Sequence, residues 1–198
     1  MYNRIVKRIL DFLVSGLLLV LLSPLFLFVA IWIKSDSQGP VLFHQNRIGK
    51  ECREFKILKF RSMRSDTPSD IPTAMLESPE TFITKSGAFL RKTSLDELPQ
   101  LINIFRGDMS FVGPRPALWN QYDLIDIREK QGVNSILPGL TGLAQVSGRD
   151  ELPIPVKAEY DAEYTRKISI GKDFRIIRLT FKNVISQKGI KEGRWSDE

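Results

Sequence analysis

Two adjacent carboxylates, Asp96 and Glu97, stand out in this sequence as residues that could act on a phosphate. An ionised aspartate can attack phosphorus and form an acyl phosphate. A neighbouring carboxylate can hold Mg²⁺, which takes oxygen ligands and usually bridges to substrate phosphates. Ser94 and Glu97, however, also have the spacing of a helix-capping box, which is a common way to start a helix. The pair therefore indicates phosphoryl chemistry, a helix start, or both.

Pro99 bears on where that helix starts. In a helix capped by Ser94, Pro99 would fall beyond the first turn and remove a needed N–H. In a helix capped by Asp96 it falls within the first turn, where a missing N–H costs little. We therefore predict a helix that begins at Asp96. Free N–H groups at such a start also attract phosphate, so capping and catalysis are compatible.

Basic side chains near the carboxylate pair could line an anion site. Arg115 stands between Pro114 and Pro116, which restrict its backbone. A fixed guanidinium can bind a diphosphate through paired hydrogen bonds. The alternative is a rigid turn with a solvated arginine. Further candidates for the anion site are Lys59, Arg61, Arg64, Arg91 and Arg149.

Composition limits the possible partners and cofactors. The chain has 198 residues and a net charge of +6, which fits one compact domain with a small appendage and an anionic partner. Nucleic acid, phosphorylated metabolites and acidic lipids all remain compatible with that charge. One cysteine, Cys52, and one histidine, His44, make a zinc site or a Cys–His catalytic pair improbable.

Residues 12–33 carry no charge and predict a membrane segment. A cleaved signal peptide is disfavoured, because the run is long and no small-x-small cleavage site follows it. Pro24 lies in the middle and breaks a helix into two arms. Each arm of roughly ten residues spans about 15 Å, short of the roughly 30 Å hydrocarbon core. Basic residues flank both ends and prefer the cytoplasmic side, which favours a re-entrant hairpin over a spanning helix.

The rest of the chain predicts an α+β fold that is mainly helical. Residues 40–45 and 54–60 look extended and predict a small β-hairpin. Mobile or irregular loops are expected over residues 64–80 and 138–149. Helices are expected over residues 80–91, 95–106, 118–131, 156–167 and 172–188. The last helix carries a basic stripe, which is either a solvated face or a contact with anionic lipid headgroups: Lys172, Arg175, Arg178 and Lys182.

Several long blocks make the chain resemble the small monotopic phosphoglycosyl transferases, a bacterial sugar transferase family that includes a bacillosamine-phosphate transferase. The resemblance covers nearly the whole chain and includes the Ser23-Pro24 break in the apolar segment. The other matching blocks are residues 59–63 (KFRSM), 94–100 (SLDELPQ), 107–116 (GDMSFVGPRP) and 138–146 (PGLTGLAQV).

The resemblance implies that residues 1–36 form a re-entrant membrane helix–break–helix with interfacial amphipathic helices nearby. It implies that residues 37–198 form a catalytic domain on the cytoplasmic face of the bacterial inner membrane. In the implied reaction, Asp96 attacks the β-phosphate of a UDP-sugar, releases UMP and passes the phosphosugar to a polyprenyl phosphate such as undecaprenyl phosphate. Glu97 would hold Mg²⁺. Expected partners are thus UDP-sugar, polyprenyl phosphate and membrane lipids, with no nucleic acid.

Family positions also suggest which residues bind the substrate, and the arginines among them match the family's phosphate and nucleotide site. One departure, residues 151–155 (ELPIP), replaces a segment with a tryptophan in the bacillosamine-transferring relative and leaves the sugar open. Two alternative functions are a glycosyltransferase that moves the sugar alone and a non-catalytic membrane adaptor. The expected substrate-binding residues are Lys59, Arg61, Arg91, Arg115, Arg149, Asp161 and Asp173.

Overall fold

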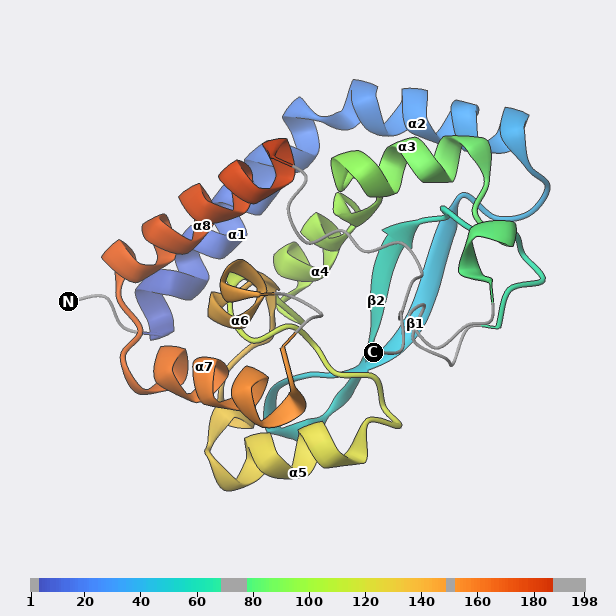
Figure 1. The fold of residues 1–198 in the computed structure, drawn as a ribbon. Coiled ribbons are helices and arrows are strands. Elements are labelled where there is room, and N and C mark those ends of the chain that lie inside the picture. The colour runs from blue at the N-terminus through green and yellow to red at the C-terminus, as the bar shows by residue number, and fades with distance from the viewer. Residues whose placement is uncertain (1–3, 69–77, 149–151, 187–198) are drawn as a thin grey trace.

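The computed structural model describes residues 4–68, 78–148 and 152–186. The predicted α+β fold, mainly helical with small sheets, is confirmed (Figure 1). The strands are β1 (Leu42–Ile48), β2 (Glu54–Phe60), β3 (Ser110–Val112) and β4 (Gly139–Thr141). The helices are α1 (Arg4–Leu21), α2 (Ser23–Asp36), α3 (Lys85–Thr93), α4 (Gln100–Arg106), α5 (Tyr122–Lys130), α6 (Leu143–Ser147), α7 (Ile154–Arg166) and α8 (Ile170–Ile185).

The predicted β-hairpin is confirmed, with a longer first strand. β1 and β2 pair antiparallel, with Leu42 opposite Phe60 and Ile48 opposite Glu54. Ile57, Leu58 and Phe60 of β2 are buried. The hairpin thus supplies one wall of the core.

A second, parallel pair of strands was not predicted. Ser110 of β3 lies opposite Gly139 of β4, and Val112 lies opposite Thr141. The expectation of an irregular loop over residues 138–149 is therefore wrong, because β4 and α6 lie within it. Strands of three residues are too short to show an alternating pattern in the sequence.

Helix boundaries differ from the predictions by a few residues. The helix expected from residue 80 begins at Lys85, because Thr84 caps it by accepting from the Gly87 amide at 3.0 Å. The helix expected from residue 118 begins at Tyr122. α8 begins at Ile170, where the Ser169 hydroxyl accepts from the Lys172 amide at 3.2 Å. Part of the expected loop over residues 64–80, residues 69–77, lies outside the described residues.

The apolar N-terminal segment forms the predicted helix–break–helix. α1 and α2 meet at a bend of 61°. Pro24 has no N–H to offer the Val20 carbonyl, which instead accepts from the Ser23 hydroxyl at 2.8 Å. Among the described residues, no single helix has the length and apolar composition of a membrane span. The bent pair meets both criteria only when its two arms are taken together.

The inner face of the bent α1–α2 pair belongs to the core of the protein. α2 lies along α3 in Figure 1, and its Val29 and Ile33 pack with Phe60 of β2 and Leu90 of α3. The outer face carries large apolar side chains that are more than half exposed: Ile5, Ile9, Leu13, Leu17, Val20, Leu21, Leu27, Phe28 and Ile31.

Charged residues at both ends of the bent α1–α2 pair join it to three other helices. Arg8 donates to the Ile104 and Phe105 carbonyls at the end of α4, at 2.6 and 3.0 Å. Lys7 pairs with the buried Asp173 of α8 at 2.6 Å. Asp36 accepts from both the amide and the hydroxyl of Ser86, at 2.8 Å each, at the start of α3. The bent helix pair is therefore fixed to α3, α4 and α8.

The basic stripe of α8 is exposed over much of its length. Arg175, Arg178 and Lys182 face solvent. Lys172 lies 3.3 Å from Glu163 of α7. Contact of this stripe with lipid headgroups stays a prediction.

We expect Lys7→Met to lower the free energy of unfolding by about 1–3 kcal/mol, because the buried Asp173 carboxylate would lose its cation. Tyr164 still donates to Asp173 at 2.7 Å, which limits the loss. Denaturant unfolding in detergent would measure the change. Lys172→Met is the matched control, since its partner Glu163 is 59% exposed, and it should cost less than about 0.5 kcal/mol. Equal losses in the two variants would contradict this docking role.

Candidate active site

Asp96 and Glu97 lie in a tight turn between α3 and α4. Ser94 adopts a left-handed conformation with φ 57°, and residues Leu95–Glu97 form one turn of 3-10 helix. The predicted helix start at Asp96 is wrong, because α4 begins at Gln100. The capping-box interpretation also fails, since the Ser94 side chain makes no cap hydrogen bond.

Pro99 explains the turn. An α-helix through Asp96 would need the residue-99 N–H for the Leu95 carbonyl. That carbonyl instead accepts from the Leu98 amide at 3.2 Å, the shorter spacing of a 3-10 turn. Leu95 and Leu98 pack against the core cluster beneath α2. Apolar contacts of Leu95 and Leu98 thus hold the turn that carries the carboxylates of residues 96 and 97.

Asp96 is buried, and its burial raises the pKa of its carboxyl to about 6. The positive charge of Lys59 opposes this rise, while the negative charge of Glu97 adds to it. Arg91, predicted to bind substrate, lies close enough to lower the Asp96 pKa through its charge. At neutral pH such a carboxyl is mostly ionised.

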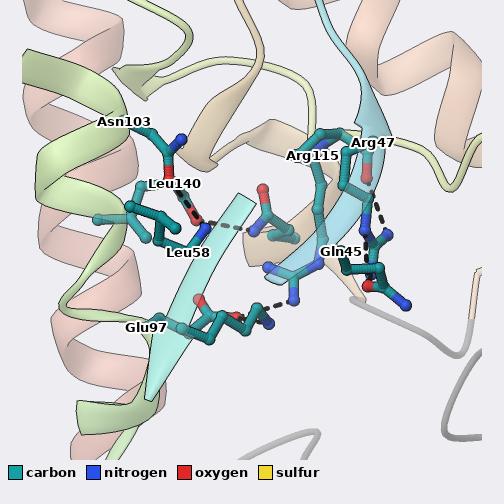
Figure 2. Close-up of polar contacts among 10 residues, drawn as sticks. Gln45, Arg47, Leu58, Glu97, Asn103, Arg115 and Leu140 are labelled. Atoms are coloured by element: carbon teal, nitrogen blue, oxygen red, sulfur yellow. Dashed lines mark hydrogen bonds and ion pairs between the residues drawn. The ribbon is translucent and has the colours of Figure 1, made fainter. Parts of the chain in front are cut away.

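Glu97 joins three segments of the chain. Its Oε1 accepts from Lys59 Nζ of β2 at 2.8 Å and from Arg115 Nη2 at 2.9 Å (Figure 2). Burial alone would raise the pKa of Glu97, but the charges of Arg115 and Lys59 outweigh it and hold that pKa well below its usual range. The structure thus brings together Lys59, Arg115 and the carboxylate pair.

Asn103 of α4 fixes β2, the strand that carries Lys59. Its Oδ1 accepts from the Leu58 amide at 2.9 Å (Figure 2). Its Nδ2 donates to the Lys56 carbonyl at 2.8 Å. Asn103 is fully buried. Sequence reasoning missed it, because a polar residue within a helical pattern is ordinarily read as solvent-facing. Asn103 thus ties β2 to α4, the helix that follows the turn of residues 95–97.

Arg115 extends from the loop between β3 and α5. The Pro114 carbonyl accepts from the Gly139 amide at 2.8 Å, which ties the loop to β4. The Arg115 side chain is 39% exposed. Its guanidinium can therefore be reached from solvent while it contacts Glu97.

Arg61 is placed differently from Lys59. Its guanidinium is buried and donates to the carbonyls of Ser37 and Gln38 and to the hydroxyls of Ser37 and Ser65. A cation at the end of α2 is favourable because the last carbonyls of a helix are partly negative. The structure gives Arg61 a role in closing α2. Arg149 lies outside the described residues.

Asp161 and Asp173, both expected to bind substrate, are buried in ion pairs. Asp161 accepts from Arg128 of α5 at 3.0 and 2.5 Å. Asp173 pairs with Lys7 and accepts from the Tyr164 hydroxyl. These partners hold helices together and were not predicted.

The carboxylate pair suits Mg²⁺ only if a substrate completes the coordination. Among the residues that the structure describes, no group of three or more histidine, cysteine, aspartate or glutamate side chains could hold a metal. Mg²⁺ commonly binds through one or two carboxylates together with substrate phosphates. Glu97, the residue predicted to hold Mg²⁺, fits that mode.

Comparison with known proteins agrees with the motifs. A family model described as bacterial sugar transferase matches residues 2–187. The chain is 40% identical over 194 residues to the UDP-glucose:undecaprenyl-phosphate glucose-1-phosphate transferase of Xanthomonas campestris pv. campestris. The aligned residues cover 94% of this chain and 40% of that protein. It is 40% identical over 198 residues to the protein of the same name from Escherichia coli K12, covering 93% of this chain and 41% of that protein.

A relative of similar length is the exopolysaccharide production protein PSS of Rhizobium leguminosarum bv. phaseoli. It is 42% identical over 194 residues, which cover 92% of this chain and 95% of that protein. By contrast, the chain spans about 40% of the length of the two glucose-1-phosphate transferases. The matches agree in one respect: the chain belongs to the bacterial sugar transferase family.

Proposed function

We propose that this protein transfers a sugar-1-phosphate from a UDP-sugar to undecaprenyl phosphate and releases UMP. The names of two relatives state this reaction for glucose-1-phosphate. The observation that carries the proposal is the carboxylate pair. Asp96 is buried with a raised pKa, while Glu97 next to it is held ionised by Lys59 and Arg115. Opposite pKa shifts on neighbouring acids are typical of a division of chemical roles.

In the first step, a carboxylate oxygen of Asp96 attacks the β-phosphorus of the UDP-sugar. A new O–P bond forms, and the bond from that phosphorus to the bridging oxygen breaks, so UMP leaves with the bonding electrons. Arg115 and Lys59 carry the positive charge that a diphosphate needs as its charge shifts to the leaving oxygen. The phosphosugar is then joined to Asp96 as an acyl phosphate.

In the second step, a phosphate oxygen of undecaprenyl phosphate attacks the same phosphorus. The bond to Asp96 breaks, and the free carboxylate is restored while the product carries a diphosphate between lipid and sugar. Glu97, together with the substrate phosphates, would hold Mg²⁺, which supplies charge neutralisation and polarises the phosphoryl oxygens when bound.

The α1–α2 hairpin supports a location at the bacterial inner membrane, with the catalytic residues on the cytoplasmic face. Its exposed apolar face suits contact with lipid, and charged residues at its two ends contact the other helices. A re-entrant hairpin would place the lipid acceptor's phosphate at the same boundary as the turn of residues 95–97.

We expect purified protein to release UMP from at least one UDP-sugar in a panel, with undecaprenyl phosphate as acceptor. Asp96→Asn should lower the rate at least about 1000-fold, because it removes the nucleophile. Asp123→Asn, at an exposed position of α5, is the matched control and should keep full activity. Release of UDP in place of UMP would favour a glycosyltransferase that moves the sugar alone, and no turnover of any nucleotide would favour an adaptor.

The raised pKa of Asp96 predicts the acid side of the pH–rate profile. The nucleophile must be ionised, so kcat/KM should fall below pH about 6, roughly tenfold per pH unit. Lys59→Met should move this limb to higher pH, because the Lys59 charge lowers the Asp96 pKa. The measurement is UMP release at low UDP-sugar and fixed Mg²⁺ between pH 5 and about 8. A flat profile down to pH about 5 would contradict the assignment.

The hairpin topology can be tested by cysteine labelling in intact cells. Asn3→Cys and Gln38→Cys, each in a Cys52→Ser background, should both resist a membrane-impermeant maleimide, because both ends of the hairpin face the cytoplasm. Both should react after permeabilisation, which is the control for accessibility. Labelling of one position alone in intact cells would indicate a spanning helix.

A further inference from the structure

The segment that carries Arg115 is held at four consecutive carbonyl groups. Pro114 and Pro116 have no N–H, so this backbone depends on its carbonyls for hydrogen bonds. Two of the four donors are backbone amides of β-strands and two are arginine side chains. The pairs are Pro114 O with Gly139 N at 2.8 Å, Arg115 O with Arg128 Nη1 at 2.8 Å, Pro116 O with Arg47 Nη1 at 3.1 Å, and Ala117 O with Ile48 N at 2.9 Å.

Arg128 of α5 makes the contact to Arg115 from inside the protein. Its side chain is 7% exposed and that of Asp161 is 1% exposed. Arg128 Nε and Nη2 both donate to Asp161 Oδ2 of α7, which leaves Nη1 directed at the Arg115 carbonyl. One planar guanidinium thus links α7 to the loop in a fixed geometry, which a lysine could not reproduce.

A buried ion pair gives little stability by itself, because desolvation offsets much of the attraction. Arg128 and Asp161 nevertheless join α5 and α7, which also pack through Leu124 and Ala158 in a cluster that includes Ala117 of the Arg115 segment. The distinctive consequence of the pair is geometric, since it places a rigid donor at one backbone carbonyl. A displacement of about 1 Å at a catalytic group can cost about 100-fold in rate.

We propose that Arg128, oriented by Asp161, is a positioning residue for Arg115. It fixes the backbone from which the Arg115 guanidinium reaches Glu97 and, under the proposed function on which this inference rests, the diphosphate of the nucleotide sugar. Asp161 then acts through two successive hydrogen-bonded partners and makes no contact with substrate.

A double-mutant cycle tests this coupling. In the protein with Arg115, Arg128→Lys should lower kcat/KM for UMP release by about 10- to 100-fold. In an Arg115→Met background, the same change should lower it by less than about threefold, because the group that Arg128 positions is gone. Equal fold losses in the two backgrounds would overturn the proposal.

Three further variants separate positioning from loss of packing. Leu124→Ala removes apolar contact from the same helix one turn before Arg128 and should have the same small effect in both Arg115 backgrounds. Asp161→Asn keeps an oxygen that can accept from Arg128, so it should retain more activity than Asp161→Leu. Equal activity in Asp161→Asn and Asp161→Leu would contradict the role of the hydrogen bond.

Hydrogen exchange gives a readout that does not depend on activity. Arg128→Lys should speed amide exchange in residues 113–118 by about tenfold, while Asp123→Asn, at an exposed position of the same helix, should leave that segment unchanged. If the unaltered protein released no UMP from any UDP-sugar, the proposed function would fail, and the exchange comparison would still decide whether Arg128 holds the segment. Unchanged exchange in Arg128→Lys would overturn the inference.

Discussion

The arrangement of this site depends on the ion pairs that the Glu97 carboxylate makes with Lys59 and Arg115. One oxygen accepts from a lysine of β2 and from an arginine of the loop after β3, so three segments distant in sequence meet at a single atom. Without that negative charge, the ammonium of Lys59 and the guanidinium of Arg115 would face each other at close range. The buried turn therefore keeps two cations beside Asp96 that repulsion would otherwise separate.

The position of the turn of residues 95–97 depends on α1 and α2. α4 has seven residues, too few for a helix to be stable without tertiary contacts. Leu101 and Ile104 of α4 pack in a cluster with Leu18 and Leu22. Arg8 of α1 donates hydrogen bonds to the last carbonyls of α4. The bent helix pair thus contributes to the core beside the turn of residues 95–97 and also carries the exposed apolar face.

Sequence patterns predicted the larger elements and the break in the hairpin. Apolar periodicity located most helices. Gly107 and Gly132 correctly marked the ends of α4 and α5, and their φ values are 100° and 71°. The parallel pair β3–β4 and the 3-10 turn at Leu95 were missed, because three residues carry too little pattern. Lys59, Arg115 and the carboxylate pair came together as expected.

The buried polar residues were beyond reach for a different reason. Asn103 and Arg128 look in the sequence like surface residues of helices, and only the fold shows their partners. Arg61 and Asp161 were recognised as notable, yet their hydrogen bonds go to the end of α2 and to Arg128. A sequence motif can identify candidate functional residues. The hydrogen-bond partner of each such residue, however, depends on contacts between segments that are distant in the sequence.

The two neighbouring acids show how such contacts separate residues of the same chemical type. Both sit on one turn, and burial favours the neutral form of each. Glu97 has two cations in hydrogen-bonding contact and stays strongly acidic, while Asp96 feels those charges from further away and becomes more basic. A carboxylate with a pKa near 6 is a better nucleophile than an ordinary aspartate and is still mostly ionised at neutral pH. Burial of the turn and the charge of Glu97, against the cations that hold the loop and β2 together, thus make Asp96 the more basic member of the pair.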